Sequence, residues 1–173
     1  MEGRAGAERE FAEFVGARYS SLLRTAYLLT GDRGHAEDLA QSALVRTFQA
    51  WRRLADPANA EAYTRATMIQ LAMRWRRRRW TGEVPTAVLP ERMAGDHAGT
   101  VKQAELLRRA LLGLPWSQRA VLVLRYYADQ SEAEIAAALG CSVGTVKSRA
   151  SRGLAGLRAA GVLAAEVGEV RRD

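Results

Sequence analysis

The sequence predicts an all-α fold of two small helical domains joined by a flexible linker, the second of them a helix-turn-helix domain. Three observations carry this prediction. Apolar residues recur at helical spacing along most of the chain, and no useful stretch alternates apolar and polar residues as a strand would. Residues 80–100 lack that period and are rich in glycine and proline, as linkers are. The 173 residues, of which 48% are hydrophobic, are enough to give two small modules a core each.

The first module, residues 1–79, is predicted to contain three helices. Gly31 ends the first, Asp32 is a candidate cap for the second, and Pro57 separates the second from the third. The expected spans are residues 8–29, 34–53 and 59–79. On the second helix we expect one buried apolar stripe, formed by Leu44, Phe48 and Trp51.

The second module, residues 101–160, is predicted to contain four helices, followed by a tail over residues 161–173. The expected spans are residues 101–112, 117–128, 131–139 and 142–159. The apolar face of the second of these is expected to carry Val121, Leu124 and Tyr127. Ser131 and Glu134 have the spacing of a capping box, in which a hydroxyl and a carboxylate satisfy free amides at a helix start. Gly140 and Cys141 are expected to form a tight turn, and Ser142 is a candidate cap for the last helix. The last two helices, joined by this turn, have the size and spacing of a DNA-binding helix-turn-helix.

In a helix-turn-helix the second helix enters the major groove with its N-terminal turns against base edges. The candidate readers are Lys147, Ser148, Ser151 and Arg152. The lysine and the arginine suit guanine acceptors, and the serines can donate or accept hydrogen bonds. The free amides at the start of this helix, with the hydroxyls of Ser142 and Thr145, suit a phosphate. On spacing alone, an ordinary helical hairpin with a solvated basic face is the alternative.

The positive charge of the chain indicates a polyanionic partner, either nucleic acid or an acidic membrane face. The formal net charge is +7, divided as +5, −2 and +4 over residues 1–79, 80–100 and 101–173. The densest run of basic residues, with Trp75 and Trp80 interleaved, consists of Arg74, Arg76, Arg77, Arg78 and Arg79. Basic residues at the C-terminal end of a helix also complement the negative end of the helix dipole. Five arginines exceed the charge that this dipole can balance, so the run favours nucleic acid as the partner.

Glu37, Asp38 and Gln41 form an acidic patch on one side of the second predicted helix. An acidic patch is unexpected on a protein whose only partner is DNA, and an arginine-rich protein surface would complement it. Acidic residues near a helix N-terminus are also favoured by the helix dipole alone. The patch itself supports both interpretations equally.

The residue inventory argues against several other classes of function. Cys141 is alone, and neither His35 nor His97 has a neighbour at metal-ligand spacing, so we expect no disulfide, metal, cofactor, catalytic triad or small-molecule substrate. No segment resembles a signal peptide or a membrane-spanning helix, and we expect a cytoplasmic protein with no membrane insertion.

Three motifs occur in the order typical of one known family. The stretch H-A-E-D-L-A-Q, residues 35–41, looks like the D-A-E-D-L-V-Q of sigma region 2.2. Leu114-Pro115 and the residues after it resemble region 4.1, and E-I-A-A-A-L-G-C-S-V-G-T-V-K-S-R, residues 134–149, is very close to region 4.2. The chain therefore resembles a bacterial sigma factor of the sigma-70 superfamily, of the short extracytoplasmic-function (ECF) class with regions 2 and 4 only. Residues 28–32, L-L-T-G-D, further resemble the actinobacterial branch of this class.

The resemblance implies a promoter-specificity subunit without catalytic activity. Its implied partners are core RNA polymerase, through the β′ coiled coil and the β flap, and promoter DNA; an anti-sigma partner is left open. The residues implied to bind the polymerase core are Glu37, Asp38 and Gln41. Those implied at the −10 element are Trp51, Tyr63, Arg65, Gln70, Arg74, Arg76, Arg77, Arg78 and Arg79. The loop over residues 54–59 is implied to receive an unstacked base, with Trp51 and Tyr63 as nearby aromatic candidates. Those implied at the −35 element are Arg125, Ser142, Thr145, Lys147, Ser148, Arg149, Ser151 and Arg152.

The chain also departs from the family pattern. His35 stands where Asp is usual, and Ser42 and Leu44 replace common acidic and aromatic residues, so core docking is expected to be weaker or tuned by His35 protonation. Two other functions are alternatives, a stand-alone repressor or activator and an enzyme acting on nucleic acid. The acidic motif and the arginine-rich helix argue against the first, because a dimerisation or ligand domain requires neither. The second lacks a metal cluster or a nucleophile–base pair.

Overall fold

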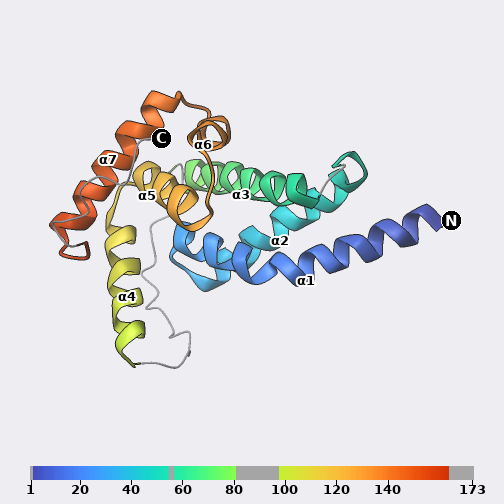
Figure 1. The fold of residues 1–173 in the computed structure, drawn as a ribbon, viewed down its shortest axis with the longest axis horizontal. Coiled ribbons are helices and arrows are strands. Elements are labelled where there is room, and N and C mark those ends of the chain that lie inside the picture. Colours follow the sequence, from blue (N-terminus) through green and yellow to red (C-terminus); the bar gives the residue numbers. More distant parts are fainter. Residues whose placement is uncertain (1, 55–56, 81–97, 164–173) are drawn as a thin grey trace. The chain divides into compact units, whose positions relative to one another are not determined.

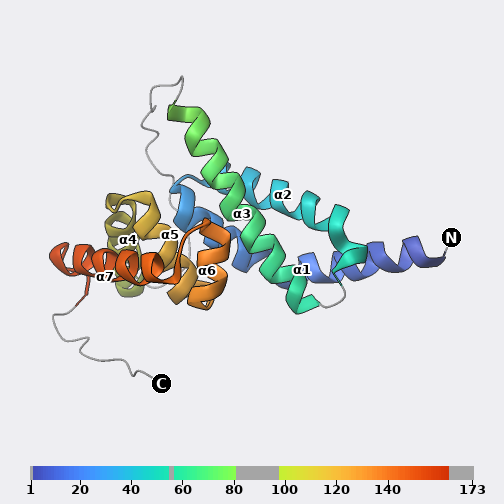
Figure 2. The same ribbon diagram turned by 90° about the horizontal axis from the view of Figure 1, so that it is seen from above.

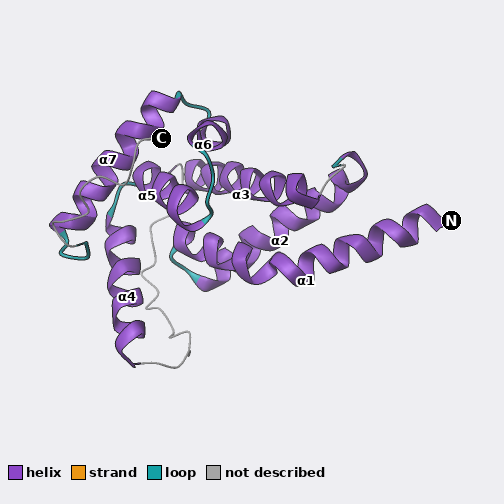
Figure 3. Cartoon of the chain, in the orientation of Figure 1, coloured by secondary structure: helices purple, strands orange, loops and turns teal. Residues whose placement is uncertain are grey.

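The computed structural model describes residues 2–54, 57–80 and 98–163, and this part of the chain consists of helices and loops without a strand (Figure 3). The predicted all-α fold is therefore confirmed for these residues. The chain divides into two compact units, Met1–Pro90 and Glu91–Asp173. Most of the predicted linker, residues 81–97, lies outside the described residues. None of the described helices is long and apolar enough to cross a membrane.

The first unit packs three long helices against one another (Figures 1 and 2). Its elements are α1 (Glu2–Thr30), α2 (Arg33–Ala50), the 3-10 turn η1 (Trp51–Arg53) and α3 (Pro57–Trp80). Helix α2 runs antiparallel to α1 and α3 and contacts both of them. The fully buried large side chains between them are Leu22, Leu29, Leu39, Met68 and Ile69. Burial of each such side chain stabilises the unit by about 1.5–3 kcal/mol.

The chain reverses between α1 and α2 as its local sequence predicts. Gly31 adopts a left-handed conformation with φ of 75°. Asp32 then caps α2, because its Oδ1 accepts a hydrogen bond of 2.8 Å from the backbone amide of His35. The predicted cap is confirmed, and it fixes where the acidic motif begins on α2.

The described part of the second unit, residues 98–163, contains four helices and one π-helical turn. Its elements are α4 (Ala98–Gly113), α5 (Trp116–Leu122), the turn η2 (Val123–Tyr127), α6 (Glu132–Leu139) and α7 (Val143–Ala159). Helix α7 packs against α4, α5 and α6, so it shares a core with the rest of the unit. The core of the unit is formed by Val121, Val123, Leu124, Ile135 and Val146.

Two glycines let α7 lie close to the elements before the helix-turn-helix. A Cβ atom added at Gly153 would lie 2.9 Å from Leu122 Cδ1, and one at Gly156 would lie 2.5 Å from Leu114 Cδ2. Both distances are too short for ordinary contact. At Gly153 the neighbour is the buried Leu122, so the approach requires a residue without a side chain, whereas at Gly156 it is one terminal methyl of the half-exposed Leu114. These close approaches fix the position of α7 on the unit.

Two side chains predicted to be buried are instead exposed. Phe48 is 42% exposed. It lies at the edge of the α2 stripe, where the ring of Phe11, 4.9 Å away, covers only part of it. Tyr127 is 42% exposed because η2 interrupts the α-helical period. The amide of Ala128 bonds to Val123 O, five residues earlier, at 3.0 Å, and the wider turn rotates Tyr127 off the buried face.

Candidate partner and nucleic-acid interfaces

The acidic patch lies on the N-terminal half of α2. Asp38 and Gln41 are exposed, and Glu37 is half-buried. Glu37 Oε1 accepts a hydrogen bond of 3.0 Å from Arg33 Nε, one turn earlier. Because both side chains of this ion pair are exposed to solvent, the pair contributes little energy. The Glu37 carboxylate can therefore exchange Arg33 for a partner protein's cation.

Two residues of the patch line a hollow between α2 and α3. The hollow has a volume of about 390 Å³ and is lined by His35, Asp38, Gln41, Ser42 and Trp75. His35 Nδ1 lies 2.8 Å from Asp32 Oδ1, which fixes one orientation of the imidazole at its edge. A carboxylate, an amide, a hydroxyl and an indole ring together suit a cationic side chain, above all the planar guanidinium of arginine.

Trp75 was not predicted to belong to this surface. Its place among arginines suggested a stacking ring for nucleic acid, whereas the structure places it beside Asp38 and Gln41 of α2. No local signal reveals this placement, because it depends on how α2 packs against α3 and brings together residues more than thirty positions apart.

Four of the predicted −10 residues share one exposed face of α3. Gln70, Arg74 and Arg77 follow Tyr63 by seven, eleven and fourteen residues, which returns each to nearly the same side of a helix. All four are exposed. Arg76 is also exposed but lies on another side of the helix end. The side chains of Arg78 and Arg79, and residues 55–56 of the loop before α3, lie outside the described residues.

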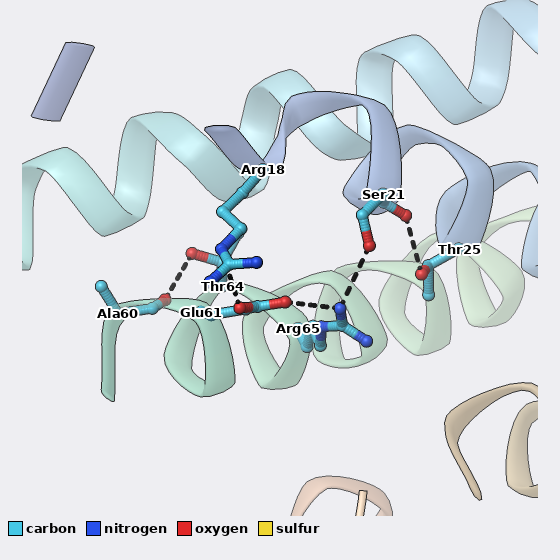
Figure 4. Close-up of polar contacts among 7 residues, drawn as sticks. All are labelled: Arg18, Ser21, Thr25, Ala60, Glu61, Thr64 and Arg65. Carbon is cyan, nitrogen blue, oxygen red and sulfur yellow. Dashed lines mark hydrogen bonds and ion pairs between the residues drawn. The ribbon is translucent and has the colours of Figure 1, made fainter. Parts of the chain in front are cut away.

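Arg65 lies on the other side of α3 and is committed to the fold (Figure 4). Its side chain is only 8% exposed, and its Nη2 lies 2.6 Å from Glu61 Oε1 and 3.2 Å from Ser21 Oγ of α1. The second oxygen of Glu61 lies 3.1 Å from Arg18 Nε, also on α1. These contacts link α3 to α1, so a DNA contact by Arg65 would require the network to open.

Trp51 is also part of the core and not an open stacking surface. It is 9% exposed, and its ring meets those of Phe11 at 5.1 Å, edge to face, and Phe14 at 5.3 Å. Aromatic pairs at such distances stabilise a fold beyond their buried area. Of the two rings predicted beside the −10 loop, only Tyr63 is exposed enough to meet a base directly, at 37%.

The helix-turn-helix forms as the sequence predicts. Ser131 and Glu134 make the capping box, with the Ser131 amide donating to Glu134 Oε2 at 2.8 Å and the Glu134 amide donating to Ser131 Oγ at 3.3 Å. The Ser131 hydroxyl and amide hold the pKa of Glu134 below its usual range. Gly140 closes α6 with φ of 62°. Ser142 then caps α7 by accepting from the Thr145 amide at 3.1 Å.

The predicted DNA-reading side chains of α7 lie opposite its buried residues. The buried residues are Val146, Ala150, Gly153 and Leu157. Lys147, Ser151 and Arg152 are exposed, whereas Ser148 is half-buried. Arg152 Nη2 lies 3.5 Å from Ser148 Oγ, so these two side chains meet on one side of the helix.

Two other predicted −35 residues flank this face. Arg149 is half-buried and its Nη1 donates to Cys141 Sγ at 3.6 Å, which ties it to the turn. Arg125 of η2 lies beside Glu132, 2.7 Å from its carboxylate, and 5.5 Å from the ring centroid of Tyr126. Arg125 is thus held at the start of α6, and Arg149 beside the turn before α7.

Family models match both units of the chain. Sigma-70 region 2 matches residues 14–81, and Sigma-70, region 4 matches residues 104–157. The chain is 44% identical over 153 residues to the RNA polymerase sigma-E factor of Streptomyces avermitilis, covering 88% of this chain and 86% of that protein. The chain belongs to the sigma-70 family.

Other relatives agree with this assignment. The ECF RNA polymerase sigma factor SigL of Mycobacterium tuberculosis is 33% identical over 164 residues, covering 91% of this chain and 93% of that one. The sigma factor RpoE of Bartonella quintana, solved in complex with the anti-sigma factor NepR, shares the fold. Its TM-score is 0.70 at 21% identity, over 88% of this chain and 96% of that one. Sigma-70 family members are transcription initiation factors rather than enzymes, and they direct RNA polymerase to promoters. The resemblance found in the sequence is confirmed.

Proposed function

We propose that this sigma factor divides its tasks among three surfaces: a docking surface on α2, a −10 surface on α3 and a −35 surface on α7. The corresponding domains are region 2 over residues 1–79 and region 4 over residues 101–160. Residues 80–100 would tether them, and residues 161–173 form a tail of unassigned role. The observation that carries the proposal is the hollow in which Asp38 and Gln41 of α2 meet Trp75 of α3.

The docking surface consists of Glu37, Asp38 and Gln41, with the hollow beside them. An arginine of the β′ coiled coil would place its guanidinium against the Asp38 carboxylate and the Trp75 ring. Charge-assisted hydrogen bonds and cation–π attraction would add there, since a partly enclosed hollow screens charges less than open solvent does. His35 and Ser42, which depart from the family pattern, line the same hollow, so they set its chemistry on this chain.

The −10 surface is the exposed face of α3 that carries Tyr63, Gln70, Arg74 and Arg77. Its arginines supply phosphate contacts, and Tyr63 supplies a ring for an unstacked base. Arg76, Arg78 and Arg79 extend the positive charge to the end of the helix. Trp51 and Arg65 are proposed as supports that hold α3 and η1 in place, because both are buried in contacts within the unit.

The −35 surface is the start of α7 and its exposed side. The amides and hydroxyls at the N-terminus, with Ser142 and Thr145, suit a phosphate. Lys147, Ser148, Ser151 and Arg152 are the candidate base readers. Arg125 and Arg149, at the flanks of this face, are the candidate phosphate contacts.

Other proposed properties belong to the chain as a whole and not to particular residues. The chain needs no cofactor and no catalytic activity of its own, and it acts in the cytoplasm with core polymerase. The β flap is a further proposed partner. So is an anti-sigma factor, because the relative from Bartonella quintana was solved with one.

The experiment combines the purified chain with core RNA polymerase from a Streptomyces species and measures transcription from fragmented genomic DNA. Arg74→Ala with Arg77→Ala should reduce strand opening at −10, detected by permanganate reactivity, and leave core binding unchanged. Arg9→Ala with Arg24→Ala, two exposed arginines of α1, is the charge-matched control. Equal loss of strand opening in both double variants would contradict the −10 assignment.

A further inference from the structure

Glu132 links two of the cations assigned to the −35 surface. Its Oε1 accepts a hydrogen bond of 2.7 Å from Arg125 Nη1, and its Oε2 lies 3.7 Å from Lys147 Nζ. The three residues come from η2, α6 and α7, so the contacts join the two helices of the helix-turn-helix to the turn before them. The Glu132 side chain is 25% exposed, whereas that of Lys147 is 66% exposed.

The start of α6 does not depend on Glu132. Ser131 and Glu134 already complete the capping box, with both hydrogen bonds in place. An acidic first residue is favourable to the helix dipole, but the dipole does not require contacts with η2 and α7. The two carboxylate oxygens of Glu132 instead meet cations that belong to other elements.

We propose that Glu132 is a positioning residue that makes region 4 favour base contacts over phosphate contacts. The inference rests on the proposed −35 role of α7. A lysine or arginine free of other charges binds any phosphate, which adds affinity without sequence information. The Glu132 carboxylate partly neutralises Arg125 and Lys147, and it repels a phosphate that approaches them. A guanine edge presents neutral acceptors, so Lys147 can reach it with less repulsion from Glu132.

The test compares two DNA probes on the complete holoenzyme. One is the duplex that wild-type holoenzyme selects from a randomised pool, and the other is the unselected pool. Binding of each is measured at several salt concentrations. Glu132→Gln should bind the unselected pool about two- to fivefold more tightly, the factor set by one partly exposed ion pair. Its salt slope on that pool should steepen by about 0.9 for each additional phosphate that the variant neutralises. Its discrimination between the two probes should fall.

Two further variants separate this effect from net charge and from folding. Glu13→Gln, an exposed position on α1 in the other unit, changes the net charge equally and should leave discrimination unchanged. In a Lys147→Gln background, Glu132→Gln should have a smaller effect, because one of the cations it restrains is gone.

Three results would overturn the inference. In the first, wild type and Glu132→Gln distinguish the selected duplex from the unselected pool equally well. This result would leave the −35 proposal standing. The second is equal weakening on both probes with a lowered melting temperature, which would mean that Glu132 only stabilises the fold. The third is a wild-type holoenzyme that selects no sequence through α7, which would contradict the −35 proposal and the inference together.

Discussion

The guanidinium of Arg65 lies 2.6 Å from the carboxylate of Glu61, one turn earlier on α3, at the contact of α3 with α1. The pair is mostly buried, and Ser21 and Arg18 of α1 complete it. The helix assigned to the −10 element is therefore anchored by one of its own arginines. Its other described arginines are exposed.

Arg65→Ala should lower the free energy of unfolding by about 1.5–3 kcal/mol, because the Glu61 carboxylate loses its closer partner and keeps only Arg18. Arg74→Ala, an exposed change on the same helix, should lower it by less than about 0.5 kcal/mol. Urea denaturation followed by circular dichroism measures both. Equal, small losses would mean that the network around Arg65 is loose in solution.

Gly153→Ala should destabilise the fold, and Gly156→Ala should not. At Gly153 the new methyl group would meet Cδ1 and Cγ of Leu122, at 2.9 and 3.1 Å, and Leu122 is buried. Overpacking of about 1–3 kcal/mol exceeds the gain of about 1 kcal/mol in helix propensity. At Gly156 the close atom is one terminal methyl of Leu114, which is half-exposed and can turn away. Thermal melting should show a loss for the first and little change or a gain for the second. A larger loss at Gly156 would contradict the packing described for α7.

Glu105 should contribute stability that depends on pH. Hydrogen bonds from Arg108, and then Arg109, lower the pKa of this carboxyl from 4.5 to about 2. A group whose pKa is lower in the folded state stabilises it above the unfolded value, and the contribution is lost as pH falls through the folded value. The difference in stability between wild type and Glu105→Gln should therefore be constant above pH 4.5 and shrink between 4.5 and 2. Since the side chain is 37% exposed, we expect less than about 1 kcal/mol. A difference that does not change with pH would argue against the ion pairs in solution.

Thr47 and Thr64 form a buried hydrogen bond between α2 and α3, with 2.8 Å between their hydroxyl oxygens. Each hydroxyl oxygen also lies within hydrogen-bond distance of a carbonyl one turn earlier on its own helix, at 2.9 Å for Thr47 and 2.7 Å for Thr64. Since a hydroxyl has one proton, one of the two donates to its carbonyl and accepts from the other threonine. Thr47→Val should lower the free energy of unfolding by about 1–2 kcal/mol, because it leaves Thr64 with fewer partners. The double change to Val should cost less than the sum of the two single changes. Strict additivity in a double-mutant cycle would show that the two hydroxyls do not interact.

The features predicted most accurately from the sequence are those set by local chemistry. The capping box of Ser131, the turn at Gly140 and the cap at Ser142 involve residues a few positions apart, and all three form as predicted. Trp51 was predicted on an apolar stripe and also as a ring beside the −10 loop. Its aromatic partners on α1 were not predicted, and they place it in the core.

The features missed depend on tertiary contacts or on a change of helical period. Arg65 carries the same charge as the exposed arginines of α3, and only the packing of α1 distinguishes it. Tyr127 follows an α-helical period that the π-helical turn η2 interrupts. Trp75 shares a hollow with Asp38 and Gln41, and Glu132 lies near Lys147, because neighbouring helices pack against each other, and no spacing rule along one helix reveals such placements.

The docking surface on α2 is tested most directly by co-elution of the chain with core RNA polymerase. Wild type should co-elute, and Glu37→Lys with Asp38→Lys should not, because reversed charge at these positions repels an arginine-rich partner. Glu10→Lys with Glu13→Lys, at exposed positions of α1, should co-elute as wild type does, and all three proteins should melt alike. Co-elution of the Glu37 and Asp38 variant at wild-type strength, with its fold intact, would contradict the docking assignment.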